Sequence, residues 1–258
     1  MRLLAVVLGA AALVFAVAGC GGGGGGGSSK PPQGDPSLRH PASDLDAALA
    51  GEEMRAQLLE ATRLYNNGRW QFSGQHMDRA QSRYASLTDA VRLRDAALDR
   101  EFHAAFGVID GQIAQRAPAP VVINRMGLMQ GQLLDAAIAD AVSNRARNDP
   151  GVGAFVMSTL LAQGGRAYAA AAREGLTDKG RHDFQDAFGL VSRANSVAHG
   201  ISPSLGGQRK RIINSIGDAH NHGFPAGVLW PKQLQPAKVA ADIARAQAAI
   251  QKRFGFHA

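Results

Sequence analysis

The chain has 258 residues, of which 45% are hydrophobic and 6% aromatic, and its formal net charge is +7. A single cysteine, Cys20, excludes an internal disulfide, and its modification would also exclude thiolate metal sites and cysteine nucleophiles. The charge is uneven, because residues 43–150 carry 12 basic and 14 acidic side chains whereas residues 151–258 carry 13 and 6. The basic second part could face anionic lipid, an anionic polymer or an acidic partner, with ordinary surface charge as the alternative.

Residues 1–20 have the layout of a secretory signal. Arg2 precedes an apolar run from Leu3 to Ala18, and small residues lead to Cys20. The four residues Val17-Ala18-Gly19-Cys20 resemble the lipobox of bacterial lipoproteins. The resemblance implies a signal peptide over 1–19 that is removed, and acylation of Cys20 by palmitate-like chains. The alternative is a retained membrane anchor, but the apolar run is shorter than the roughly 20 residues that a spanning helix needs.

A flexible tether is expected to follow Cys20. Eight glycines, two serines and three prolines fall between Gly21 and Pro36, a composition that disfavours helix. We therefore predict a lipidated cysteine and tether over 20–42, which reaches about 25 Å as a random coil. The predicted location is extracytoplasmic, on a bacterial membrane. Because Gly21 is not aspartate, the resemblance implies the outer membrane in an organism with two. A nucleic-acid partner is not expected.

Residues 43–258 are predicted to form one all-helical domain, because apolar residues recur at spacings of three and four and no stretch alternates. The expected helices cover 43–65, 74–115, 120–148, 152–173, 178–199, a shorter segment around Ile212–Ile216, and 236–254. The stretch 220–235 is expected to be irregular. This pattern predicts an all-α, single-domain bundle of six or seven helices. It contains one long amphipathic helix, 74–115, and one central apolar helix, 152–173.

The first candidate site is a metal site formed by Asp218, His220 and His222. If this segment is extended, residues two apart project to the same side and could meet one zinc, copper or iron ion. His257 could supply a fourth ligand. The alternative is a polar loop with exposed imidazoles, and a helical backbone would weaken the metal hypothesis.

The second candidate lies on the predicted long helix, where Asp95 falls within the apolar stripe and Asp99 and His103 follow at four-residue steps. A carboxylate that faces a core needs a partner. Asp95 could be a ligand or a proton-handling group in the bundle interior, with Glu101 or His76 as its partner. The alternative is a structural ion pair with an arginine from a neighbouring helix.

The third candidate is an anion site at Arg209, Lys210 and Arg211, which follow two glycines. Three adjacent cations could bind phosphate or a lipid headgroup. The alternative is the solvated start of a helix, although cations oppose the helix dipole there.

These observations give three expectations for function. The first is a membrane-anchored cell-envelope lipoprotein that acts as a non-enzymatic binding or scaffold protein, with the membrane and an envelope protein or anionic polymer as partners. The second is a lipoprotein that handles a divalent transition metal or haem through its His/Asp cluster. The third is an enzyme with a site in the bundle interior. Recognisable hydrolase, zinc-protease and dinucleotide motifs are absent from the sequence.

Overall fold

The computed structural model describes residues 34–225, 229–231 and 233–256. The lipobox, Cys20 and the glycine run lie outside these residues, as does His257. All the secondary structure in the described part is helical, so the predicted all-α fold is confirmed. Among the described helices, none combines the length and the apolar character needed to span a bilayer.

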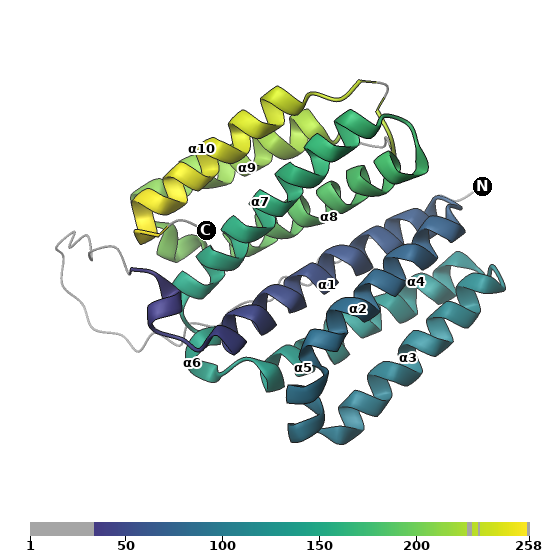
Figure 1. The fold of residues 1–258 in the computed structure, drawn as a ribbon. Helices are drawn as coiled ribbons and strands as arrows, with labels where there is room; N and C mark the ends of the chain where they lie inside the picture. The colour runs from purple at the N-terminus through teal and green to yellow at the C-terminus, as the bar shows by residue number, and fades with distance from the viewer. Residues whose placement is uncertain (1–33, 226–228, 232, 257–258) are drawn as a thin grey trace, which may run out of the picture.

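The first half of the domain packs around its own apolar core. Its elements are α1 (Ala42–Asn66), α2 (Trp70–Arg94), α3 (Ala96–Ala114), α4 (Ala119–Leu128), a π-helical segment (Met129–Leu133), α5 (Leu134–Ala141) and the short α6 (Asn144–Arg147). Tyr84 and Phe102 stack at the centre of this core, and both are almost fully buried. The helices α1, α2 and α3 lie side by side as an antiparallel layer (Figure 1).

The second half forms another core. Its elements are α7 (Pro150–Glu174), α8 (Asp178–Gly200), a 3-10 segment (Ser202–Gln208), α9 (Arg209–Gly223) and α10 (Pro236–Phe254). Phe184, Tyr168 and Phe224 form an aromatic cluster in its centre. The predicted central apolar helix corresponds to α7, which packs against α8, α10 and α1.

The helix α1 joins the two halves, because it packs on α2 on one side and on α7 and α8 on the other (Figure 1). At Gly189 the backbones of α8 and α1 come so close that a Cβ atom would lie 2.8 Å from the carbonyl oxygen of Ala56. Only glycine permits that approach. The junction is also polar, since α1 contributes Glu52 to an ion pair with Arg193 and Glu53 to a hydrogen bond from Gln163.

The predicted long helix over 74–115 is wrong, because the chain turns back at Asp95. Its backbone leaves the helical region (φ −144°, ψ 87°), and its carboxylate accepts hydrogen bonds from the amides of Ala97 and Leu98. Asp95 is therefore the N-cap of α3 rather than a position inside a helix. The apolar stripe continues in phase across the turn, so α2 and α3 bury the same residues that one helix would bury.

Two other boundaries differ from the prediction. The expected helix over 120–148 is interrupted at Val142, which is extended, and Ser143 then caps α6 while bonding to the buried carboxylate of Asp44. The expected tether also ends before residue 42. A 3-10 turn spans Pro36–Leu38, and Pro36 and His40 are buried against the domain.

Candidate functional site

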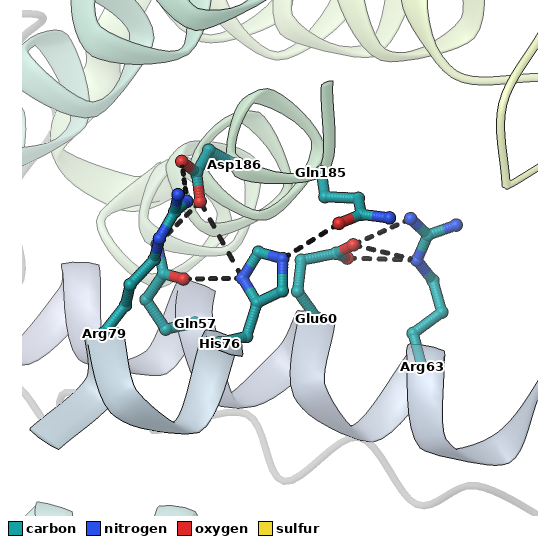
Figure 2. A network of polar contacts seen from close by, with 7 residues as sticks. All are labelled: Gln57, Glu60, Arg63, His76, Arg79, Gln185 and Asp186. Carbon is teal, nitrogen blue, oxygen red and sulfur yellow. Dashed lines mark hydrogen bonds and ion pairs between the residues drawn. The ribbon is translucent and has the colours of Figure 1, made fainter. Parts of the chain in front are cut away.

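A buried network of polar side chains links α1, α2 and α8 at the junction between the halves (Figure 2). The network consists of Gln57, Glu60 and Arg63 from α1, His76 and Arg79 from α2, and Gln185 and Asp186 from α8. Helical spacing places the three α1 residues on one face, at steps of three. The α8 pair comes from more than 100 residues further along the chain.

His76 lies at the centre of the network and is fully buried. Its Nδ1 atom is 2.6 Å from Gln57 Oε1 and 3.8 Å from the carboxylate of Asp186, and its Nε2 atom is 3.1 Å from the side-chain amide of Gln185. Gln57 donates its own amide to Asp186, which fixes its oxygen toward His76. Burial lowers the pKa of His76 to about 4. At neutral pH the ring is therefore uncharged, and its single N–H group can donate to only one of the two glutamine oxygens that face it.

Glu60 is the second fully buried titratable group. Arg63 donates three hydrogen bonds to it, from Nε to both carboxylate oxygens at 3.0 and 3.2 Å and from Nη2 at 2.7 Å. Burial nevertheless raises the pKa of Glu60 to about 7, against the opposing effect of Arg63. The guanidinium of Arg63 also lies 4.3 Å above the ring of Phe188 on α8. Arg63 thus connects α1 to α8 as well as compensating the charge of Glu60.

The network lacks access for a substrate, since its central groups His76 and Glu60 are fully buried. Its charges are compensated from within, with Arg79 paired to Asp186 and Arg63 to Glu60. These partners come from both halves of the domain. The arrangement therefore holds the halves together and binds protons, but it offers no open position for a ligand.

A second polar region is open to solvent. A cavity of about 660 Å³ lies where the α1–α2 turn and the start of α2 meet the end of α3. Its lining residues are Gly68, Arg69, Trp70, Gln71, Phe72, Gly74, Gln75, Asp78, Asp110, Ile113, Ala114 and Arg116. The volume falls within the range typical of small-molecule sites.

Asp78 and Asp110 form the acidic end of the cavity. Within the described chain, no cationic side chain lies within ion-pairing distance of either carboxylate. Burial and the neighbouring Asp78 both raise the pKa of Asp110. Gln75 lies on α2 between Asp78 and the aromatic residues Trp70 and Phe72, and its buried side-chain oxygen has no hydrogen-bond partner. Such a group is costly unless something else occupies the cavity.

The other end of the cavity is positive. It contains the first turn of α2, where the N-cap residue Arg69 provides no side-chain cap for the free backbone N–H groups. Helix N-termini attract anions, and the exposed Arg69 adds a full positive charge. The guanidinium of Arg116 lies 4.6 Å above the ring of Trp70 and contributes a second cation. The cavity thus separates two carboxylates from two cations along α2.

The cavity and the buried network are neighbours. Phe72 lines the cavity, and its ring centroid is 5.0 Å from that of His182 on α8. The ring of His182 is in turn 5.8 Å from the ring of His76. Burial lowers the pKa of His182, followed by the charge of Arg79, and its Nδ1 atom is buried without a partner. Phe72 and His182 thus form a chain of ring contacts from the cavity to His76 at the centre of the junction.

The structure does not bring the predicted metal ligands together. The metal hypothesis required an extended backbone, but Asp218, His220 and His222 all lie in α9, where His220 projects away from the face shared by Asp218 and His222. His222 bonds to the buried Asp242 at 2.7 Å, and Asp218 lies 3.7 Å from Arg245. His220 packs between Phe188 and Phe224. Among the described residues there is no group of three His, Cys, Asp or Glu side chains placed to hold a metal.

The second predicted set is also divided. Asp95 is exposed and caps α3, so its expected place in the core was wrong. Asp99 is buried, and it accepts a hydrogen bond of 2.9 Å from Tyr84 rather than pairing with an arginine. His103, half of whose side chain is exposed, lies 3.6 Å from Asp99. The hydrogen bond from Tyr84 explains why Asp99 can be buried. Asp95, Asp99 and His103 do not line the cavity.

The predicted cations Arg209, Lys210 and Arg211 are all exposed at the start of α9. In the described part of the chain no acidic side chain lies within ion-pairing distance of them. They remain available to an anionic partner.

Sequence reasoning did not find the cavity or the role of Glu60. One signal was present for the network, because Glu53 and Glu60 are seven residues apart and so share one face of the helix predicted over 43–65. No comparable signal marked Asp78 or Asp110, which lie on different helices. Comparison of the chain with family models, with curated proteins and with solved structures gives no match.

Proposed function

We propose that this chain is a lipid-anchored envelope protein that binds a short zwitterionic peptide in the open cavity between α2 and α3. The observation that carries the proposal is the separation of unpaired charge in the lining. Asp78 and Asp110 can receive an ammonium group, while Arg69 and the first N–H groups of α2 can receive a carboxylate.

The distance between the two ends fits a short peptide. Asp78 lies eight positions after Trp70 on α2, which corresponds to about 12 Å along the helix axis. An extended chain of three residues spans about 10 Å. The unpaired oxygen of Gln75 lies between the two ends, where it can accept a hydrogen bond from a backbone N–H group of the ligand.

The apolar part of the lining favours a hydrophobic side chain in the middle of the peptide. The apolar part of the lining consists of Trp70, Phe72 and Ile113, and the side chain of Trp70 is only 36% exposed. Aromatic walls with a few polar groups are typical of small-ligand sites. The lipid anchor rests on the lipobox resemblance at Val17–Cys20 and on the long glycine run behind it.

The test is a fluorescence titration of Trp70 with three related peptides. We expect zwitterionic Ala-Phe-Ala to bind at least tenfold more tightly than its N-acetylated form, which cannot pair with the carboxylates. The peptide with a C-terminal amide should lose affinity to a similar extent, because it lacks the carboxylate that pairs with Arg69. Trp230 is the only other tryptophan, and it lies in the second half of the domain. The variant Trp70→Phe should therefore lose the signal.

The variant Asp110→Asn should bind the zwitterionic peptide more weakly, while its affinity for the acetylated peptide should be unchanged. The matched control is Asp89→Asn, which removes an aspartate that is 92% exposed further along α2. Equal affinity for all three peptides, or an equal loss in the control variant, would refute the proposed ligand. Separately, Cys20→Ser should abolish membrane fractionation. A variant that remains membrane-bound and processed would refute the lipid anchor.

A further inference from the structure

We propose that the end of the bundle from which the tether emerges rests directly on an anionic lipid surface. The inference builds on the lipid anchor of the proposed function and adds an orientation. It identifies a basic surface and one exposed leucine as a second membrane contact. We call this surface the basic end and define it by five exposed cations: Arg145, Arg209, Lys210, Arg211 and Lys252.

The described chain begins at this end. Arg39 and His40 both bind the carboxylate of Asp149, each at 2.7 Å, and so attach the entering chain to the start of α7. Asp149 also caps α7 by accepting a hydrogen bond from the amide of Gly151. The tether therefore joins the domain next to α6 and the first turn of α7 (Figure 1).

The same first turn of α7 contacts the region that carries the cations. A Cβ atom at Gly153 would lie 2.7 Å from the side chain of Ile201, which directly precedes the 3-10 segment Ser202–Gln208. Arg253, at the end of α10, donates a hydrogen bond of 2.8 Å to the carbonyl of Ser204 in that segment. Since α9 begins directly after the segment, Arg209–Arg211 and Lys252 gather beside the point where the tether enters.

Most acidic groups at this end are already compensated. Asp149 pairs with Arg39, Asp44 is buried and bonds to Ser143, and Asp35 caps the first 3-10 turn. Asp46 is exposed on α1, and Asp140 in the last turn of α5 has no cationic partner among the described residues. The five exposed cations therefore leave a clear positive excess, and an anionic leaflet attracts such charges strongly when they lie close to it.

One apolar side chain points to lipid rather than to a soluble anion. Leu38, in the 3-10 turn that leads from the tether, is 85% exposed. A leucine placed where an anchored chain meets the domain can enter the interface between headgroups and acyl chains. Isolated exposed leucines are common on protein surfaces. The position of Leu38 beside the tether and the cations is what supports a contact with lipid.

The orientation has a consequence for the cavity. The helix α1 runs from the tether end to the α1–α2 turn that lines the cavity, and its 25 residues span about 37 Å. Figure 1 shows the two ends of α1 at opposite ends of the bundle. A domain that stands on its basic end would therefore hold the cavity away from the membrane, open to the surrounding compartment.

The test uses the mature lipidated chain with a fluorescent label on an introduced cysteine. Because Cys20 is acylated, Leu38→Cys supplies the only free thiol. Leu176→Cys is the matched control, since Leu176 is 60% exposed in the α7–α8 turn at the opposite end of α7. An environment-sensitive dye at position 38 should shift to the blue on vesicles containing phosphatidylglycerol but not on pure phosphatidylcholine. The dye at position 176 should not shift on either.

Charge variants separate the basic end from general electrostatics. R209Q/K210Q/R211Q should reduce membrane contact of the dye about 100-fold, because each cation near an anionic surface contributes roughly fivefold. The control R173Q/K179Q/R181Q removes three exposed cations at the opposite end and should retain the shift. High salt should abolish the shift in the parent chain, since screening shortens the range of these charges.

The outcomes distinguish the two proposals. A chain that floats with phosphatidylcholine vesicles, but whose dye at position 38 stays aqueous on anionic ones, keeps its anchor and overturns the orientation. A chain that fails to float with neutral vesicles overturns the anchor itself. If the dye stays aqueous while poly-glutamate binds saturably and the triple variant loses that binding, the basic end serves an acidic polypeptide and the membrane inference is wrong.

Discussion

The buried network and the open cavity contain similar side chains, but the charged groups are paired in the network and unpaired in the cavity. Both draw on α2, and both combine carboxylates, arginines and a glutamine amide. In the network, Glu60 is held by Arg63 and Asp186 by Arg79. In the cavity, Asp78 and Asp110 have no cationic partner among the described residues. Folding therefore compensates the charges of the first set, whereas the charges of the second set stay unpaired and could pair with the proposed ligand.

The difference follows from where each region lies. The network is enclosed by three helices from both halves, so an uncompensated charge there would be expensive. The cavity lies at the open end of the α2–α3 pair, where water can solvate the carboxylates. Unpaired charge is therefore tolerable in the cavity and costly in the network. The variants below test that distinction, beginning with the largest expected effect.

Arg63→Met should destabilise the protein most. It removes the partner of a carboxylate that is fully buried, and breaking such a pair costs about 4 kcal/mol. Urea unfolding at pH 8, where Glu60 is charged, measures the loss. The double variant Glu60→Gln/Arg63→Met should recover most of it, because no buried charge then remains. A double variant as unstable as the single one would show that Arg63 acts only through its packing on Phe188.

Glu60→Gln should reveal a pH dependence that the parent chain conceals. The folded pKa of His76 is lowered to about 4, so its contribution to stability is complete above pH 6.5 and is lost as the pH falls through 4. The folded pKa of Glu60 is raised to about 7, so its contribution is present below pH 4.5 and is lost as the pH rises through 7. The two contributions oppose each other between pH 4.5 and 6.5.

Removing Glu60 should therefore leave only the increase in stability with pH that His76 causes. We expect the stability of Glu60→Gln, relative to the parent, to increase by about 3 kcal/mol between pH 4.5 and 7. Denaturant unfolding across this range measures it, and the difference cancels the titration of other groups. A relative stability that is constant with pH would contradict the proton-binding role of the network.

Asp95→Ala should have an intermediate effect. This exposed carboxylate is compensated by backbone amides rather than by a cation, and loss of an N-cap costs about 1 kcal/mol. Thermal unfolding measures the change. Asp95→Asn keeps an acceptor at the cap and should cost much less. Equal losses for the two variants would mean that the turn at Asp95 does not depend on capping.

Asp78→Asn and Asp110→Asn should have the smallest effect on stability. Neither carboxylate has a partner to lose, so we expect changes within about 0.5 kcal/mol in urea unfolding at pH 7. Their effect should appear instead in peptide binding. A destabilisation above about 2 kcal/mol would show that these groups serve the fold, as the network does, and would remove the contrast between the two regions.

The sequence by itself determined most of the local structure. Apolar spacing predicted the helices that became α1, α7, α8 and α10 to within a few residues, because the side of a helix that is buried depends on neighbours three and four positions away. It also predicted one apolar stripe over 74–115, which α2 and α3 do bury, although it joined the two into one helix. One extended residue at Asp95 leaves the apolar spacing in phase, so periodicity alone cannot detect the turn.

Tertiary structure decided which polar groups are paired. His76 and Gln185 are 109 positions apart, and Glu60 owes its raised pKa to helices that enclose it from both halves. The acidic end of the cavity depends on Asp78 and Asp110 meeting across two helices. The lipid anchor remains a prediction from sequence, whereas the basic end depends on contacts that bring residues 39, 149, 201 and 253 to one place. A local pattern specifies which face of a helix is buried, but a charge finds its partner only when distant elements pack together.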